Sequence, residues 1–160
     1  MLLVNADSVN KALRNAMSKI EGIHFETSVE NGAFFERRKK SNFDFSYYNK
    51  MLNYEKFWNY CRNQADFDER IKQSITLEYQ ESWKTFIDTY KPIKTENIDV
   101  GIADNTVVGE IQFGNWAMIY KDIFRLLRAK NSPGVDLYIY ITDTGKLNKF
   151  LSSQVVEYKK

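Results

Sequence analysis

The hydrophobic pattern of this chain changes its period near Asn97, and this change limits the folds that it can adopt. Before Pro92, apolar residues recur at the three- and four-residue spacing of a helix face. After Asn97, apolar and polar residues alternate, as in a strand with one buried face. A helical pattern and a second alternating run, Val135–Thr142, then follow. The order predicts an α/β fold with a central mixed sheet flanked by helices and a mostly helical N-terminal half.

The chain has 160 residues, which is enough for one domain with one hydrophobic core. We expect a single domain, with a mainly helical part over residues 1–95 and a hairpin, a helix and a strand over residues 96–160. Asn31-Gly32 is a turn signal in the aromatic-rich N-terminal part.

Three longer helices are predicted from the apolar periodicity and the capping residues. They cover Ser8–Glu21, the region Tyr54–Tyr90 with a break near Asp66, and Asn115–Lys130. A last helix begins near Lys146. In the third helix, we expect the apolar stripe to face the core; it consists of Tyr120, Ile123, Phe124 and Leu127.

Charge and composition exclude several classes of protein. The net charge of +2 does not fit a nonspecific nucleic-acid coat, so any DNA binding must come from local patches. The only cysteine, Cys61, has no partner for a disulfide, which fits the reducing cytoplasm. The only histidine, His24, excludes a histidine-based zinc cluster. No apolar run approaches the length of a membrane span, so we expect a cytoplasmic protein with no membrane partner.

The first alternating segment predicts a hairpin, with one strand over Ile98–Ala103 and the other over Thr106–Phe113. If Asp104-Asn105 forms a two-residue turn, Asp99 lies directly opposite Glu110. Since side chains alternate along a strand, Gln112 then shares a face with Glu110.

Opposed carboxylates repel each other, and a cation between them removes that cost. Two hard oxygen ligands beside a polar side chain suit Mg²⁺, which takes one or two carboxylates and keeps water or phosphate as its other ligands. The alternative is an amphipathic hairpin whose outer face carries solvated Asp99, Glu110 and Gln112. Geometry alone leaves both interpretations open.

The residues of this hairpin resemble the active-site segment of BglII-type restriction endonucleases, a branch of the PD-(D/E)xK nucleases. The resemblance is carried by Ile98-Asp99-Val100-Gly101 and by Glu110-Ile111-Gln112-Phe113-Gly114-Asn115, in which glutamine stands where most of these nucleases have lysine. Trp83-Lys84 lies upstream of the first aspartate, as in that family. The similar region covers about Ile71 to Lys160.

The resemblance implies a role for each matching residue. Asp99 and Glu110 are the expected metal ligands, together with the carbonyl of Ile111, and Gln112 is expected to orient the attacking water. The implied cofactor is Mg²⁺, for which Mn²⁺ substitutes. Asn115 occupies a position that contacts DNA in the family, although it equally suits a helix N-cap.

This sequence departs from the family pattern in two ways. The spacing between Asp99 and Glu110 is longer, which one extra residue in each strand would accommodate without changing the cross-strand pairing. The longer spacing leaves Asp104 as a rival first ligand. BglII-type chains also continue past the final helix, whereas this one ends at Lys160, as expected of a short form, a fragment or one subunit of a pair.

The implied activity is that of a type II restriction enzyme, which hydrolyses double-stranded DNA at a short palindrome. The resemblance suggests a site containing GATC that is cut to leave a 5′ overhang, and a palindrome implies a homodimer. Two alternatives stay open. One is a strand-nicking subunit that pairs with a separate recognition subunit, and the other is a DNA-binding module that does not cleave.

Two basic groups are candidates for contacts with DNA phosphates. The first is the run Arg37, Arg38, Lys39 and Lys40, which equally suits a solvated loop. The second comprises Arg125, Arg128 and Lys130 near the end of the third helix, where cations also interact favourably with the helix dipole.

Overall fold

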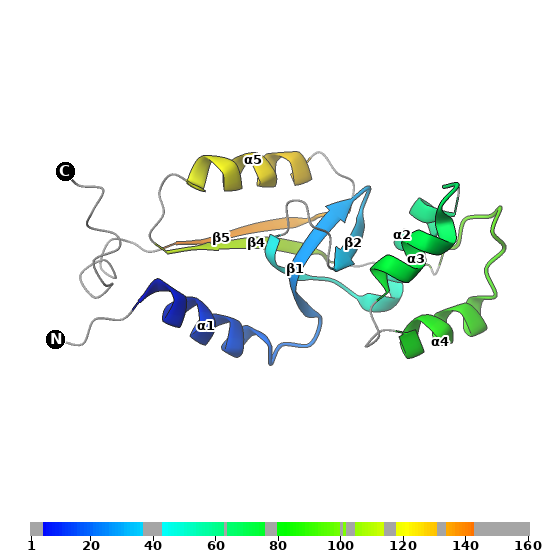
Figure 1. Cartoon of the computed structure of the whole chain (residues 1–160), viewed down its shortest axis with the longest axis horizontal. Coiled ribbons are helices and arrows are strands. Elements are labelled where there is room, and N and C mark those ends of the chain that lie inside the picture. The colour runs from blue at the N-terminus through cyan, green and yellow to red at the C-terminus, as the bar shows by residue number, and fades with distance from the viewer. Residues whose placement is uncertain are drawn as a thin grey trace.

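The structure is a computed structural model that describes residues 5–36, 43–62, 64–75, 80–99, 101, 105–113, 118–130 and 134–142. Five strands form one mixed sheet in the order β2-β1-β3-β4-β5. Helix α5 lies on one side of β4 and β5, and helix α1 lies on the other (Figure 1). Helices α2, α3 and α4 lie together at the end of the molecule that is far from the two termini. The predicted α/β class, with a mixed sheet flanked by helices, is therefore confirmed.

Three of the strands come from the N-terminal part of the chain, which also contains four helices among its described residues. They are β1 (Ile23–Glu30), β2 (Ala33–Glu36) and β3 (Phe43–Tyr47), and β1 pairs antiparallel with both of the others. The turn signal Asn31-Gly32 does connect β1 to β2, and both residues have positive φ, as a tight hairpin turn requires. The three strands themselves were not predicted, because the many aromatic residues on both sides of this turn hide the two-residue alternation of a strand.

The helices begin and end close to where the sequence predicts them. Helix α1 (Ala6–Met17) is capped by the side chain of Asn5, and α2 (Lys50–Cys61) by that of Asn49. The break expected near Asp66 separates α2 from α3 (Phe67–Ser74). A further helix, α4 (Gln80–Tyr90), completes the group.

An aromatic cluster joins these helices to the sheet. Phe35 of β2 packs edge-on against Phe57 of α2, and both side chains are almost fully buried. Trp83 of α4 stacks on Phe86 and meets the ring of Tyr54 edge-on. Aromatic pairs of this kind add to the stabilisation that comes from their buried area. These aromatic residues therefore form the hydrophobic core between the helices and the sheet.

Strand β4 (Val107–Gln112) lies between β3 and β5 (Leu137–Thr142) and carries the predicted site residue Glu110. It is antiparallel to β3 and parallel to β5. Helix α5 (Ile119–Lys130) makes the crossover from β4 to β5. The second strand, the helix and the later strand of the predicted order are thus present.

The predicted hairpin is wrong, because Ile98, Asp99 and Gly101, the described residues of its first strand, lie outside the sheet. Strand β5 pairs with β4 along its whole length, and β3 pairs with Val107–Gly109 on the edge that the hairpin would need. Within the described part of that segment, the backbone of Ile98 instead exchanges two hydrogen bonds, both of 2.8 Å, with the side chain of Asn59 on α2. Asp99 therefore does not face Glu110 across a hairpin.

The apolar stripe of α5 faces outward, which also corrects the prediction. Tyr120 and Phe124 are 73% and 66% exposed, while Ile123 and Leu127 are 44% and 50% exposed. The side that faces the sheet contains Asp122, Arg125 and Leu126. Periodicity locates an apolar stripe on a helix, but it does not state whether the core or a partner covers that stripe. No helix among the described residues is long and apolar enough to span a bilayer.

We expect the substitution Gly109→Ala to destabilise the protein severely. A Cβ atom at this position of β4 would lie 2.1 Å from the ring of Phe45 on β3, much closer than two carbon atoms can approach. Phe45 is buried and cannot move away freely. Thermal unfolding should show a loss of about 2 kcal/mol or more. The double variant with Phe45→Leu should recover part of that loss, and additive losses would contradict the proposed clash.

Candidate functional site

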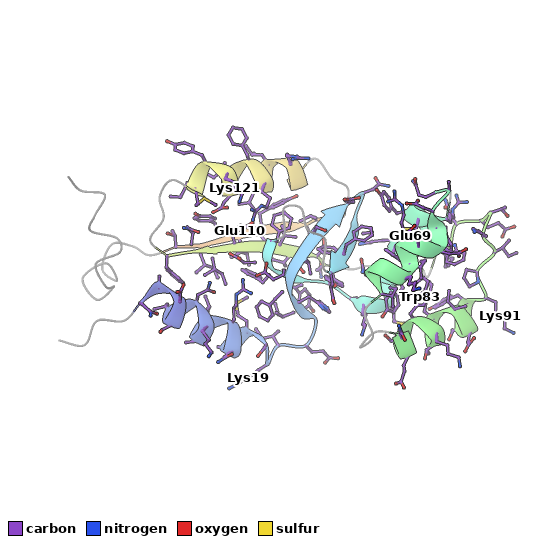
Figure 2. The ribbon with its side chains drawn as sticks, in the orientation of Figure 1. Lys19, Glu69, Trp83, Lys91, Glu110 and Lys121 are labelled. Carbon is purple, nitrogen blue, oxygen red and sulfur yellow. The ribbon has the colours of Figure 1, made fainter. Side chains whose placement is uncertain are left out.

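A layer of side chains between α5 and the strands β4 and β5 contains the candidate site. At one end of this layer, Val108 of β4 lies beside Tyr138 of β5, and both pack in an apolar cluster that includes Leu126 of α5. One step further along both strands, on the same face, Glu110 lies beside Tyr140. Figure 2 shows Glu110 in this layer, beneath α5. The layer is therefore apolar at one end and carries a carboxylate at the other.

Glu110 is buried, with 3% of its surface exposed. Its Oε1 atom accepts a short, charge-assisted hydrogen bond from Nη1 of Arg125, which reaches down from α5. Asp122, one helical turn before Arg125, is also buried, and its Oδ1 lies 4.0 Å from the same guanidinium nitrogen. Arg125 is consequently neither a solvated helix residue nor free to contact DNA, because it neutralises charge inside the protein.

Asp44 adds a third carboxylate from the neighbouring strand β3. Its Oδ2 accepts a hydrogen bond of 2.7 Å from the backbone N–H of Ile111, the residue after Glu110. Its Oδ1 lies 3.0 Å from Nη2 of Arg14 on α1. Two arginines from opposite faces of the sheet thus hold Asp44 and Glu110 in place.

The electrostatics of this cluster disfavour the ionised form of Glu110. Burial raises its pKa, and the negative charges of Asp44 and Asp122 raise it further. The hydrogen bond and the positive charge of Arg125 act in the opposite direction, and the resulting pKa is about 8. The pKa of Asp122 is also raised, mainly by burial. Burial is therefore the main reason that the ionised forms of Glu110 and Asp122 are disfavoured, and an added cation would favour those ionised forms.

Of the other predicted site residues, Gln112 lies on the same strand as Glu110 and Asp99 does not. Gln112 is half-buried, and strand alternation places it on the same face of β4 as Glu110. Asp99 is exposed, and its Oδ1 accepts a hydrogen bond of 2.7 Å from the N–H of Gly101, which closes a local turn. The structure therefore places Glu110 and Gln112 on one face of β4, whereas the carboxylate of Asp99 is exposed and bonds within its own turn.

Several predicted residues lie outside the described part of the chain. They are Asp104, Asn115 and the basic run Arg37, Arg38, Lys39 and Lys40, together with the helix expected from Lys146. Of the second basic group, Arg128 is exposed on α5, and the side chain of Lys130 is not described.

The sequence reasoning missed Asp44, Asp122 and Tyr140 as members of this cluster. Asp44 had a usable signal, because Phe43-Asp44-Phe45-Ser46-Tyr47 alternates like a strand and places a carboxylate among buried aromatic residues. Asp122 and Arg125 had no such signal, since their spacing is typical of any solvated helix face.

A divalent metal ion is chemically compatible with the donor set. Glu110 and Asp44 supply hard carboxylate oxygens from adjacent strands, and Mg²⁺ needs only one or two carboxylates from a protein. Among the described residues, no group of three or more histidine, cysteine, aspartate or glutamate side chains could hold a metal ion without other ligands. Any metal here would therefore depend on backbone, water or substrate oxygens for its remaining ligands.

Comparison with known proteins identifies the family. The family model for the restriction endonucleases BglII and BglIII matches residues 6–160, which is nearly the whole chain. No curated protein and no solved structure matches this chain. The match includes β4 with its buried Glu110, the crossover helix α5 and the strand β5. The chain therefore belongs to the BglII/BglIII family of restriction endonucleases.

Proposed function

We propose that this chain is a magnesium-dependent type II restriction endonuclease that hydrolyses both strands of DNA at a short palindrome. Membership of the restriction endonuclease family gives the class of reaction. The observation that carries the assignment to a site is the buried Glu110 on β4, which has two further carboxylates close enough to raise its pKa. A buried, electrostatically perturbed carboxylate in such a cluster is typical of a functional site.

The roles that we assign follow the side chains of β4. Glu110 is the central metal ligand, and the carbonyl of Ile111 is a further ligand. The family motif assigns the second carboxylate ligand to Asp99. Asp44 is the alternative ligand for that position, because it lies on β3, the strand that pairs with β4. When bound, Mg²⁺ would stabilise charge on the scissile phosphate and make the attacking water more acidic. Gln112 orients that water, since an amide donates and accepts hydrogen bonds but is not a base near neutral pH.

Contacts with DNA come from residues outside the described part of the chain. We assign phosphate contacts to Arg37, Arg38, Lys39 and Lys40, because each cationic contact adds salt-dependent affinity. Asn115 follows β4 closely in the sequence and is assigned a DNA contact next to the site. A GATC-containing site with a 5′ overhang is the corresponding proposal for specificity.

The function is tested by incubating unmethylated phage DNA with the native chain and Mg²⁺ or Mn²⁺. Discrete fragments that disappear in EDTA support the proposal, and the sequences of their ends give the site and the cut position. Nicked circles without linear products would instead identify a strand-nicking subunit that needs a partner. Binding without cleavage at any metal concentration would identify a DNA-binding module.

A homodimer is the assembly that we propose, and the outward stripe of α5 is its interface. An apolar patch formed by four large side chains on one helix is unusual on an isolated monomer and marks a contact surface. A second copy is the fitting partner, because cutting both strands of a palindrome requires two sites related by a two-fold axis. Contact through α5 would also fix the relation between the two sites, since Arg125 of α5 binds Glu110.

We expect Phe124→Glu to convert the dimer into a monomer at micromolar concentration, as measured by sedimentation velocity. Phe124 is 66% exposed in the centre of the stripe, so a buried charge there would oppose association without disturbing the core. Ile93→Glu is the matched control, because Ile93 is 58% exposed in another part of the molecule. A native chain that is monomeric, or equal effects of the two variants, would contradict this interface.

A further inference from the structure

The layer of side chains beneath α5 contains two tyrosines to which the proposed function gives no role. The hydroxyl groups of Tyr138 and Tyr140 on β5 are buried, and neither has a hydrogen-bond partner among the described residues. A buried hydroxyl without a partner costs free energy, so it usually marks a place where a water molecule or a ligand belongs.

The surroundings of the two hydroxyl groups differ. Tyr138 pairs in register with Val108 and packs in the apolar cluster of Val108 and Leu126. Tyr140 pairs in register with Glu110, so both side chains project from the same face of adjacent parallel strands. After burial, the negative charge of Asp122 on α5 raises the pKa of Tyr140 most, followed by the charges of Glu110 and Asp44. Tyr140 is therefore an unsatisfied donor among three carboxylates.

The chemistry of these groups defines what is missing. Carboxylates only accept hydrogen bonds when ionised, whereas a tyrosine hydroxyl both donates and accepts. Burial and the nearby negative charges raise the pKa of Tyr140, so its hydroxyl keeps its proton at neutral pH. Water is the small molecule that can accept from the hydroxyl and donate to a carboxylate at the same time.

We propose that Tyr140 is a further catalytic residue of this site, whose hydroxyl holds the attacking water against the carboxylate of Glu110. This inference rests on the proposed function. Gln112, on the same face of β4, provides a second contact to the same water. With two contacts from adjacent strands, the direction in which the water presents its lone pair is fixed before the phosphate arrives. Hydrolysis itself is unchanged: water adds to phosphorus, the 3′ oxygen leaves, and one proton is transferred from the water to that oxygen or to solvent.

The test compares Tyr140→Phe with Tyr138→Phe, because each substitution removes one unpartnered buried hydroxyl and keeps the ring. We expect Tyr140→Phe to lower the single-turnover cleavage rate about tenfold to a hundredfold, with DNA affinity in EDTA unchanged. Tyr138→Phe should cleave at the native rate. Both variants should keep a Tm close to that of the native chain, since each keeps the aromatic ring and its packing.

Each other outcome contradicts the proposal in a recognisable way. Native cleavage by both variants, or an equal loss in both, would show that the hydroxyl of Tyr140 has no special role. A fall in Tm confined to Tyr140→Phe would mean that the hydroxyl makes a structural hydrogen bond instead. A crystal structure of the native chain and of Tyr140→Phe tests the inference independently of cleavage. An ordered water between the Tyr140 hydroxyl and Glu110, absent from the variant, supports it, whereas no water in the native chain overturns it even if the chain cleaves DNA.

Discussion

Glu110→Ala should abolish DNA cleavage, lowering the single-turnover rate by about three orders of magnitude or more. Glu110 is the buried carboxylate on which the proposed site is built, and no other described acidic residue of β4 could replace it. Cleavage of a plasmid that contains the cognate site, followed on a gel over a range of Mg²⁺ concentrations, measures the effect. DNA binding in EDTA should survive, because affinity depends mostly on phosphate contacts.

Two matched variants then decide which aspartate completes the site. Asp99→Asn and Asp44→Asn each remove one negative charge with little change of shape, and the one that matters should lose cleavage as completely as Glu110→Ala. Asp44→Asn keeps an oxygen that can accept from the N–H of Ile111, so the sheet should remain intact. Native cleavage by Glu110→Ala would place the active site elsewhere in the chain.

The free energy of unfolding should fall as pH rises from about 4.5 to about 8 when divalent metals are removed with EDTA. The ordinary pKa of 4.5 for Glu110 rises to about 8 in the folded protein, mainly because the side chain is buried. Between these values the folded state holds a proton that the unfolded chain has released. Folding then takes up a proton, so the contribution of Glu110 to stability is complete below pH 4.5 and lost above pH 8.

The expected loss is on the order of 5 kcal/mol across that interval. Urea unfolding at several pH values measures it, and Glu110→Gln is the control because a neutral amide does not titrate. The variant should keep only the weaker dependence that Asp122 contributes in the same direction. Millimolar Mg²⁺ should flatten the native profile, since a bound cation favours the ionised carboxylate. Equal slopes for the native chain and the variant would contradict this assignment.

The sequence by itself determined several local elements and pointed to Glu110 as the central residue of the proposed site. Asn31-Gly32 specifies a tight turn, and the break near Asp66 follows from the loss of helical periodicity there. Glu110-Ile111-Gln112 was recognisable because a motif is a local arrangement of residue types, which needs no knowledge of the fold. The alternating run around it also predicted its strand correctly.

Only the tertiary structure decided which segments lie beside that strand. Strand pairing joins residues that are distant in sequence, so β3 could take the edge of β4 that local alternation had assigned to Ile98–Ala103. This pairing brings Asp44 to Glu110 across 65 intervening positions, and the β4–α5–β5 crossover adds Asp122, Arg125 and Tyr140. The same limit explains the stripe of α5, because periodicity locates an apolar face but the packing of the whole chain decides whether it is buried.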